Sequence, residues 1–265
     1  MPDRIEHNRG IARHFDEHSE FWDIVYSRDY LALNPQFRSL FHREQHFFEL
    51  LADAKRGKVL DLGCGGAHFL IRLAQSGFEE AVGMDISSEL IDRARSAVES
   101  AGLKGKIELV LGDVEELSRF QEGSFDAVVA LGLIEYLQTD ELLLKQIHRI
   151  LRPGGVCVIQ TRNAKCLPVT IKSAIKRLVS KPEAVWFRRH DPTRFRRIIE
   201  ACGFEVVEER FSHYYPLFPL TELPILKRLL ADRIPLLAEK AERRPIGGTS
   251  KFRASMFIVK FRKTG

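Results

Sequence analysis

Three aspartates and one cluster of glycines are the residues whose types and spacing point most directly to chemistry. Asp61 stands two positions before Gly63 in the stretch VLDLGCGGAHF, and Gly65 and Gly66 follow. Such a loop lets the backbone approach a ligand, and the helix N-terminus behind it favours an anion. A carboxylate at Asp61 would repel a phosphate at that place and attract a cation. The stretch therefore predicts a ligand that brings a positively charged group to the glycine loop.

The dinucleotide-binding pattern G-x-G-x-x-G is the main alternative for this loop. Its third glycine is missing, because Gly63 and Gly65 are followed by His68. Two further acids, Asp85 and Asp113, stand at or after the ends of the next two apolar runs. Each alone would be an ordinary turn or cap residue, but their ordered occurrence favours a binding role. A ligand with a nucleoside at one end and a cationic amino-acid group at the other, such as S-adenosylmethionine, satisfies both features.

The elements that must position these residues alternate in type from residue 58 onward. Short apolar or β-branched runs predict strands, and amphipathic stretches bounded by capping residues predict helices between them. The predicted strands cover 58–62, 80–86, 106–113, 124–132, 154–162, 204–212 and 252–263, and the predicted helices cover 67–77, 87–102, 139–151 and 191–203. This alternation is typical of an α/β fold with a doubly wound, mostly parallel sheet covered on both faces. Apolar residues at helical spacing predict further helices within 1–57, one of them starting at Asn34-Pro35.

Composition bounds the class of protein. The 265 residues, 45% of them hydrophobic, suffice for one large domain with a substantial core. The absence of a long uncharged apolar run and of a signal-like N-terminus predicts a cytoplasmic protein. The four cysteines form no C-x-x-C pair, which argues against a zinc knuckle and predicts reduced thiols. The net charge of +5 is concentrated in 163–190, where seven Lys or Arg face one Glu.

Five motifs, taken as a set, carry a resemblance to a known family. They are VLDLGCGGA, VGMDIS, LGDVEEL, FDAVVALGLIEYL and ILRPGG. Over roughly residues 58–160 the sequence resembles the class I S-adenosylmethionine-dependent methyltransferases of the small-molecule type, with a weaker match to the end. The resemblance implies a Rossmann-like sheet of seven strands whose last strand is antiparallel. It also implies S-adenosyl-L-methionine as the cofactor and S-adenosyl-L-homocysteine as the product.

The resemblance implies which residues hold the cofactor. The acid of the first motif would lie near the methionyl amino group, the second acid would bind the ribose hydroxyls, and the third would accept from the adenine amino group. Leu131 would lie close to the sulfonium. The common third glycine of the loop falls at Ala67, where a methyl group is expected to be tolerated. The expected set is Asp61, Gly63, Cys64, Gly65, Gly66, Asp85, Ile86, Asp113, Val114 and Leu131.

The remaining chain is expected to cover this core. Residues 1–57 are predicted to form an N-terminal helical lid, and residues 58–265 a methyltransferase domain with insertions at 163–190 and 213–250. Tyr26 and Arg28 of the lid are hypothesised to close over the cofactor, with the arginine engaging its carboxylate. Glu115 and Glu116 are expected to be solvated.

The acceptor is defined mainly by exclusion. No [DN]-P-P-[YF] box or Pro-Cys dipeptide marks a nucleobase enzyme, and no Asp-Asn pair marks a metal site, so no metal is predicted. The loop GLIEYL resembles that of small-molecule and quinone or lipid methyltransferases, in which His often stands at the place of Tyr136. Tyr136, His190 and His213 are the candidates for a catalytic base.

Both insertions mix cations with apolar residues, which favours a small, hydrophobic or aromatic acceptor methylated on oxygen or nitrogen. The same mixture allows peripheral contact with an anionic membrane surface. An RNA methyltransferase is one rival, supported by the charge alone and lacking an RNA-binding module, so nucleic acid is disfavoured. A non-catalytic protein that binds S-adenosylmethionine is the other rival, and cofactor binding without turnover would identify it.

Overall fold

The computed structural model describes residues 3–27, 38–179, 187–214 and 252–264, together with Arg233 and Lys240. This described part contains one seven-stranded sheet in the order β3-β2-β1-β4-β5-β7-β6. Strands β1 to β5 run parallel, and β7 is antiparallel to its neighbours β5 and β6. The predicted α/β sheet with an antiparallel last strand is confirmed. The strands are β1 (Lys58–Leu62), β2 (Glu80–Asp85), β3 (Ile107–Leu111), β4 (Phe125–Leu131), β5 (Leu151–Arg162), β6 (Phe204–Tyr214) and β7 (Ala254–Lys263).

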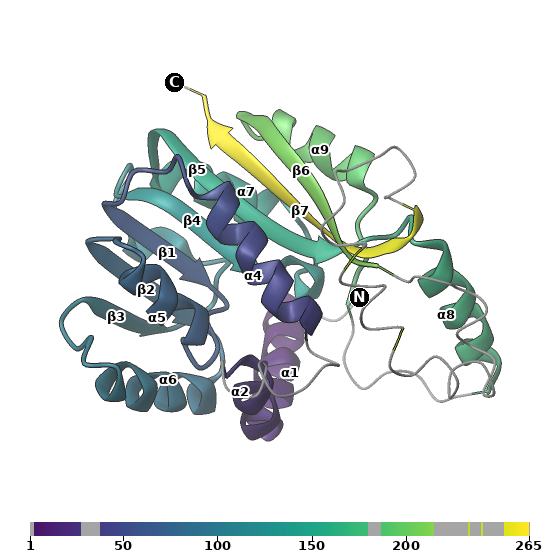
Figure 1. Ribbon diagram of the computed structural model, residues 1–265, viewed down its shortest axis with the longest axis horizontal. Coiled ribbons are helices and arrows are strands. Elements are labelled where there is room, and N and C mark those ends of the chain that lie inside the picture. The colour runs from purple at the N-terminus through teal and green to yellow at the C-terminus, as the bar shows by residue number, and fades with distance from the viewer. Residues whose placement is uncertain are drawn as a thin grey trace.

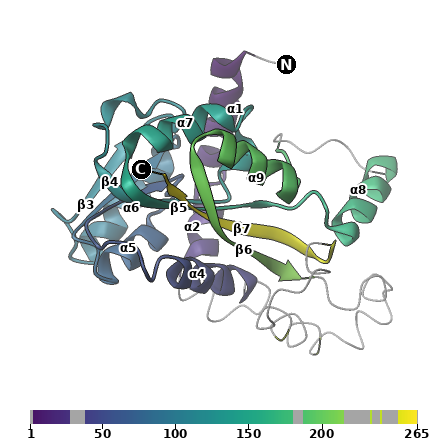
Figure 2. The ribbon, with the colours of Figure 1, turned by 90° about the horizontal axis from the view of Figure 1, so that it is seen from above.

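Helices cover both faces of the sheet, as two perpendicular views show (Figures 1 and 2). One face carries α4 (Arg38–Leu50) and α5 (His68–Gln75), and the other carries α7 (Glu141–Ile150) and α9 (Pro192–Ala201). Helix α6 (Ser88–Ser100) packs beside β3. Helices α1 (Arg4–Glu17) and α2 (Ser19–Tyr26) lie past the carboxyl ends of the strands, and α8 (Leu167–Val179) stands away from the sheet. Single 3-10 turns follow β3 at η2 (Leu117–Arg119) and β4 at η3 (Ile134–Tyr136).

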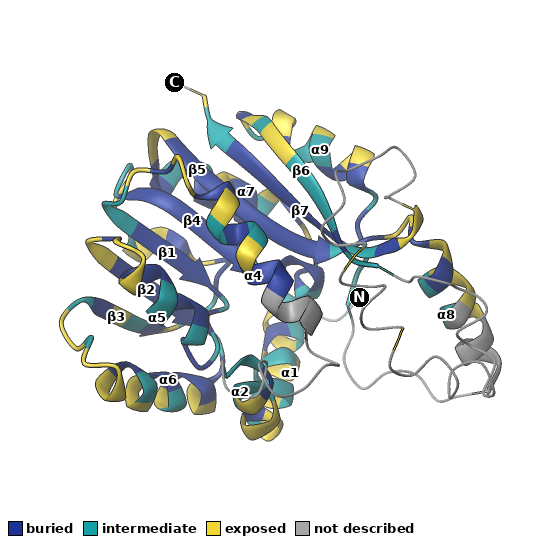
Figure 3. Cartoon of the chain, viewed as in Figure 1, coloured by how far each residue is buried: buried dark blue, intermediate teal, exposed yellow. Residues whose placement is uncertain are grey.

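The two faces of the sheet have separate hydrophobic cores, because successive strand residues point to opposite sides. Leu60 and Leu62 of β1 join the cluster that contains the buried side chains of α7 and α9. Val59, one position away, joins the cluster built from α4, α5 and α6. Figure 3 shows the central strands β1, β2, β4 and β5 largely buried, the edge strand β6 largely intermediate or exposed, and the outer helix surfaces exposed. The site lies at the carboxyl edge of this sheet.

Two local features differ from the sequence prediction. Strand β5 begins at Leu151 instead of 154, because Leu151 pairs with Phe125 before a register shift, and the Gly154 backbone turns at a positive φ of 75°. Asp140 precedes α7 without capping it, and its carboxylate binds Arg188 and His190 instead. Tertiary ion pairs have replaced a local cap in this case.

Several predictions fall on residues that the structure does not describe. The expected helix start at Asn34-Pro35 and most of the 213–250 insertion lie outside the described residues. The 163–190 insertion contributes α8, on which Leu167 and Ile171 are exposed. Within the described residues, no helix combines the length and apolar character that crossing a membrane requires.

Candidate active site

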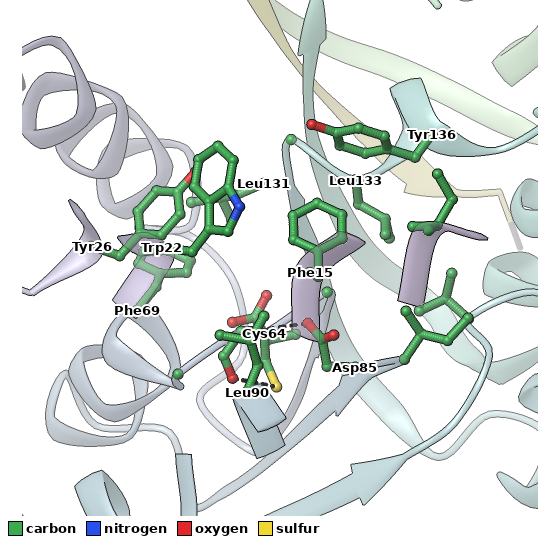
Figure 4. Close-up of a pocket in the computed structure, with 18 of the residues that line it drawn as sticks. Phe15, Trp22, Tyr26, Cys64, Phe69, Asp85, Leu90, Leu131, Leu133 and Tyr136 are labelled. Atoms are coloured by element: carbon green, nitrogen blue, oxygen red, sulfur yellow. Dashed lines mark hydrogen bonds between the residues drawn. The ribbon is translucent and has the colours of Figure 1, made fainter. Parts of the chain in front are cut away.

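A pocket lies at the carboxyl ends of β1 to β4, covered by residues of α1 and α2 (Figure 4). Parallel strands end at the same edge, so loops that are distant in sequence meet there. The loops contribute Asp61, Gly63, Cys64, Gly65 and Gly66 from β1 and the turn after it, Asp85 and Ile86 from β2, Asp113 and Val114 after β3, and Leu131, Gly132 and Leu133 after β4.

The glycine loop after β1 takes a backbone path that side chains disfavour. Gly63 and Gly65 have φ values of 71° and 51°, in the left-handed region where glycine carries no steric penalty. A Cβ atom on Gly63 would lie 3.1 Å from Leu133 Cδ1, whereas one on Gly65 would meet no described heavy atom within 4 Å. Ala67 also lies in this region, with φ 61°. Its Cβ atom makes this backbone conformation less favourable than it would be for glycine. The loop is shaped as a cradle that is open in front of Gly65.

Asp85 holds the glycine loop in place through hydrogen bonds to its backbone. Its Oδ2 atom accepts a hydrogen bond from the Gly65 N–H at 2.8 Å, and its Oδ1 atom accepts from the Ser87 N–H at 2.9 Å. Burial raises the pKa of Asp85, and these backbone donors oppose the rise. The carboxylate therefore holds two loops together and faces the pocket with its remaining acceptor capacity.

Asp61 is a buried acid of the pocket. Its side chain is buried on β1, and burial together with the nearby Asp85 carboxylate raises its pKa well above the ordinary value. The Arg43 and Arg72 guanidinium groups oppose that rise. A cation entering the pocket would compensate the buried negative charge, which is the situation in which such a carboxylate ionises readily.

Asp113 is tied to the N-terminal helix. Asn8 of α1 donates from Nδ2 to Asp113 Oδ2 at 2.7 Å and to Glu115 Oε2 at 3.2 Å. The expectation that Glu115 is solvated is wrong, because its side chain is buried under α1 by this contact. Glu116 is exposed and pairs with Arg4. Hydrogen bonds to two acids of the loop after β3 thus attach helix α1 to the pocket.

Aromatic side chains also line the pocket. Phe15 contacts Trp22 and Tyr136 at centroid distances of 5.9 Å and 5.4 Å, and Trp22 stacks on Tyr26 at 6.0 Å. Figure 4 shows Trp22 and Tyr26 on one side, Tyr136 on the other, and Phe15 between them next to Asp85. The pocket is therefore lined both by carboxylates and by aromatic rings. Burial raises the pKa of Tyr136 to about 12, so its phenol stays protonated at neutral pH.

Further polar contacts hold the helical cover in place. Asp16 accepts from Ser87 Oγ at 2.6 Å, and Asp23 pairs with His68 Nε2 at 2.7 Å. The His7 ring contacts the Tyr136 carbonyl oxygen at 2.7 Å. These contacts attach α1 and α2 to Ser87 before α6, to the first residue of α5 and to the last residue of η3.

A buried polar group behind the β4 loop escaped the sequence analysis. Arg43 of α4 donates from Nη1 to Gln160 Oε1 at 3.2 Å, and Arg162 Nε lies 3.5 Å from Glu135 Oε1. Glu135 and Gln160 are buried, and Arg43 lines the pocket. The one available signal was an acidic residue, Glu135, inside the apolar run ALGLIEYL. Nothing local in the sequence linked it to Arg43.

The structure gathers most of the predicted site residues. Tyr26, Tyr136 and all ten residues expected from the strand-end motifs line the pocket, and Arg28 lies outside the described residues. His190 does not line it: its ring is buried, with Nδ1 2.8 Å from Thr161 Oγ1 and Nε2 3.0 Å from Asp140 Oδ1. His213 is also absent from the lining, and lies at the end of β6 with φ 59°. Of the three candidate bases, the pocket contains Tyr136.

Comparison with known proteins adds independent findings. Residues 60–159 match a family model described as a methyltransferase domain. The chain is 28% identical over 164 residues to a ubiquinone biosynthesis O-methyltransferase from Psychrobacter arcticus, covering 60% of this chain and 63% of the relative. It is 30% identical over 152 residues to a sterol 24-C-methyltransferase from Aspergillus fumigatus, covering 55% of this chain and 40% of the relative. The chain thus spans less than two thirds of the length of either relative.

A solved structure matches over nearly the whole chain. It is the magnesium protoporphyrin IX methyltransferase from Synechocystis with bound S-adenosylhomocysteine, with a TM-score of 0.66, 16% identity, and coverage of 97% of this chain and 100% of that one. At this identity the likeness shows a common fold.

Proposed function

We propose that this chain, which belongs to the class I S-adenosylmethionine-dependent methyltransferases and uses S-adenosylmethionine as its cofactor, transfers the methyl group to an oxygen or nitrogen atom of a small, hydrophobic or aromatic metabolite. The observation that carries the proposal is the lining of the pocket, which combines carboxylates and glycine backbone from the strand ends with aromatic side chains from the N-terminal helices. Leu131 lies beside Trp22 and Tyr26, and Leu133 lies beside Phe15 and Tyr136 (Figure 4).

The residues of the pocket fit the cofactor by their chemistry. Asp61 would compensate the cationic amino group, Asp85 would accept from the ribose hydroxyls, and Asp113 would face the adenine end. The positive φ values at Gly63 and Gly65 let the backbone approach the ligand, which larger residues would prevent. When bound, S-adenosylmethionine supplies a methyl group on a positively charged sulfur.

The chain's own residues would contribute orientation and exclusion of water. Phe15, Trp22 and Tyr26 line the pocket and would pack against a flat or apolar acceptor. Hydrogen bonds of Asn8, Asp16 and Asp23 attach helices α1 and α2 to the segments around the pocket. A closed, aligned pocket can supply much of the rate enhancement of a displacement reaction. The names of the curated relatives, which act in ubiquinone and sterol chemistry, also support a lipophilic acceptor.

Two measurements test the proposal. Isothermal titration with S-adenosylhomocysteine should give a one-to-one complex. Incubation with S-adenosylmethionine labelled in its methyl group should then transfer label to members of a panel of phenols, hydroxylated quinol analogues and aromatic amines. Lack of S-adenosylhomocysteine binding would overturn the cofactor site. Tight binding with no transfer to any member would favour a non-catalytic binding protein.

A further inference from the structure

A small polar niche adjoins the pocket where β4 ends, and we define it by Glu135 Oε1, Gln160 Oε1 and Arg43 Nη1. A Cβ atom built on Gly132 would lie 3.7 Å, 3.8 Å and 3.9 Å from these three atoms. Gly132 and Arg43 both line the pocket, and Gly132 directly follows Leu131. Three side chains from separate parts of the chain therefore lie around Gly132, beside the lining of the pocket.

The niche contains unused hydrogen-bonding capacity. Glu135 Oε2, Gln160 Nε2 and Arg43 Nε are buried and have no hydrogen-bond partner among the described residues. The Gln160 side chain is fully buried, and that of Glu135 is 3% exposed. Buried polar atoms are normally paired, because leaving them unpaired costs free energy. Such a cluster beside a ligand pocket points to a ligand that completes it.

The charges in the niche favour one kind of ligand. Arg43 from α4, Arg162 from β5 and His190 are the charged or titratable groups that act on Glu135, and Tyr136 adjoins it in sequence. Burial raises the pKa of Glu135, and the two guanidinium groups oppose the rise. A hydroxyl group donates one hydrogen bond, here to Glu135, and accepts another, here from Arg43. A neutral amine has a single lone pair, which must attack the methyl carbon, so it keeps none to accept a hydrogen bond from Arg43, whereas a hydroxyl oxygen has two.

We propose that the methyl acceptor is a hydroxyl compound whose hydroxyl group enters this niche, where Glu135 takes its proton and Arg43 holds its oxygen. The inference rests on the proposed methyl transfer and narrows it to oxygen. In the step, the acceptor O–H bond breaks and its proton passes to the Glu135 carboxylate. The oxygen forms a bond to the methyl carbon as the carbon–sulfur bond of the donor breaks, and that electron pair stays on sulfur. Gln160 positions the Arg43 guanidinium through its Oε1 atom.

The test compares Glu135→Gln with Glu79→Gln, a matched change at an exposed position outside the pocket. Methyl transfer is measured with pairs of acceptors that differ only in a phenolic hydroxyl or an aromatic amine. A second readout needs no turnover: 4-nitrocatechol, whose ionisation changes its visible absorbance, is titrated into each protein saturated with S-adenosylhomocysteine. Calorimetric affinity for S-adenosylhomocysteine and the melting temperature are recorded for each variant.

The proposal expects transfer to the phenol of each pair and a loss of at least about a hundredfold in Glu135→Gln, the scale of general base catalysis. Affinity for S-adenosylhomocysteine should stay within about twofold in both variants. Bound 4-nitrocatechol should ionise at higher pH in the wild type and in Glu79→Gln than in Glu135→Gln, because the Glu135 carboxylate disfavours a second negative charge beside it. Should Glu135→Gln unfold, Glu135→Asp keeps the carboxylate and should retain part of the activity.

The outcomes separate this inference from the proposed function. Wild-type protein that binds S-adenosylhomocysteine but methylates only the amine of each pair would overturn the hydroxyl niche and leave methyl transfer standing. Equal phenol transfer in wild type and Glu135→Gln, or equal 4-nitrocatechol spectra, would overturn it as well. Failure of the wild type to bind S-adenosylhomocysteine would overturn the cofactor site, on which both the hydroxyl niche and the proposed methyl transfer depend.

Discussion

Asn8 on helix α1 donates a hydrogen bond to Asp113, the acid that follows β3, at 2.7 Å and across 105 residues of sequence. The same amide group also reaches Glu115 at 3.2 Å. One neutral side chain thus bridges two carboxylates and fastens the N-terminal cover to the end of the pocket expected to hold adenine.

Asn8→Asp should therefore loosen the cover. A third carboxylate would be placed against Asp113 and Glu115, and like charges at this separation repel. We expect faster hydrogen–deuterium exchange in Arg4–Glu17 and an affinity for S-adenosylhomocysteine lower by about tenfold, equivalent to 1.4 kcal/mol. Arg9→Ala changes the charge of the same helix by the same amount at an exposed position and should leave both quantities unchanged. Unchanged exchange in Asn8→Asp would contradict the anchoring role.

Asp85→Asn should weaken cofactor binding because an amide has one oxygen where the carboxylate uses two. Gly65 and Ser87 both donate to Asp85, so the amide nitrogen of Asn would face one of these N–H groups. We expect affinity for S-adenosylhomocysteine to fall by about tenfold or more in calorimetric titration. Asp92→Asn, whose side chain is 68% exposed, is the control. Equal affinities of the two variants for S-adenosylhomocysteine would contradict the assignment of Asp85 to the cofactor site.

Asp61→Asn should stabilise the protein without ligand while weakening cofactor binding. The pKa of Asp61 is raised in the folded protein, so the folded state retains its proton to higher pH than the unfolded state. Stability from this group is present below the unfolded pKa and is lost as pH rises through the folded pKa. The variant should therefore melt at a higher temperature than the wild type at about pH 8, with the gap closing towards about pH 4.

Calorimetric titration should show the opposite effect of the same change on binding. Without the carboxylate, the cationic amino group of S-adenosylhomocysteine has no buried partner, and affinity should fall by about tenfold. A variant that is less stable than the wild type at about pH 8 would contradict the buried-charge argument. A variant with unchanged affinity would contradict the assignment of Asp61 to the amino group.

Asp140→Asn should destabilise the fold and leave the pocket intact. Asp140 binds His190 and Arg188 while its side chain is 5% exposed, and removing one partner of a buried ion pair typically costs about 3 kcal/mol. Although burial acts in the opposite direction, the His190 and Arg188 contacts lower the pKa of Asp140. Its stabilisation is present above the unfolded pKa and is lost as pH falls through the folded pKa, so the variant and the wild type should converge in acid.

Thermal unfolding followed at several pH values checks this prediction, with a decrease of about 2–4 °C expected for each kcal/mol. Affinity for S-adenosylhomocysteine should remain within about twofold of the wild type, because neither Asp140 nor His190 lines the pocket. If Asp140→Asn instead loses much of its affinity for S-adenosylhomocysteine while its melting temperature is unchanged, the Asp140–His190 pair has a role in the functional site.

The local sequence determined the fold and the carboxylates of the pocket. Alternating apolar runs and amphipathic stretches specify strands and helices through periods of two and 3.6 residues. In a parallel sheet, residues that end successive strands share one edge, so Asp61, Asp85 and Asp113 converge wherever such a sheet forms. Their spacing along the chain was sufficient to predict a site there.

Tertiary structure alone decided what surrounds those acids. Arg43 meets Gln160 across 117 residues, and Asn8 meets Asp113 across 105, through helix docking that no local period encodes. Docking of α1 also buried Glu115, which the sequence suggested was solvated, and His190 pairs with Asp140 across 50 residues. Local patterns fix which face of an element is apolar, but the free energy that selects its partner comes from packing between distant segments. The acceptor niche beside Gly132 is a product of that packing.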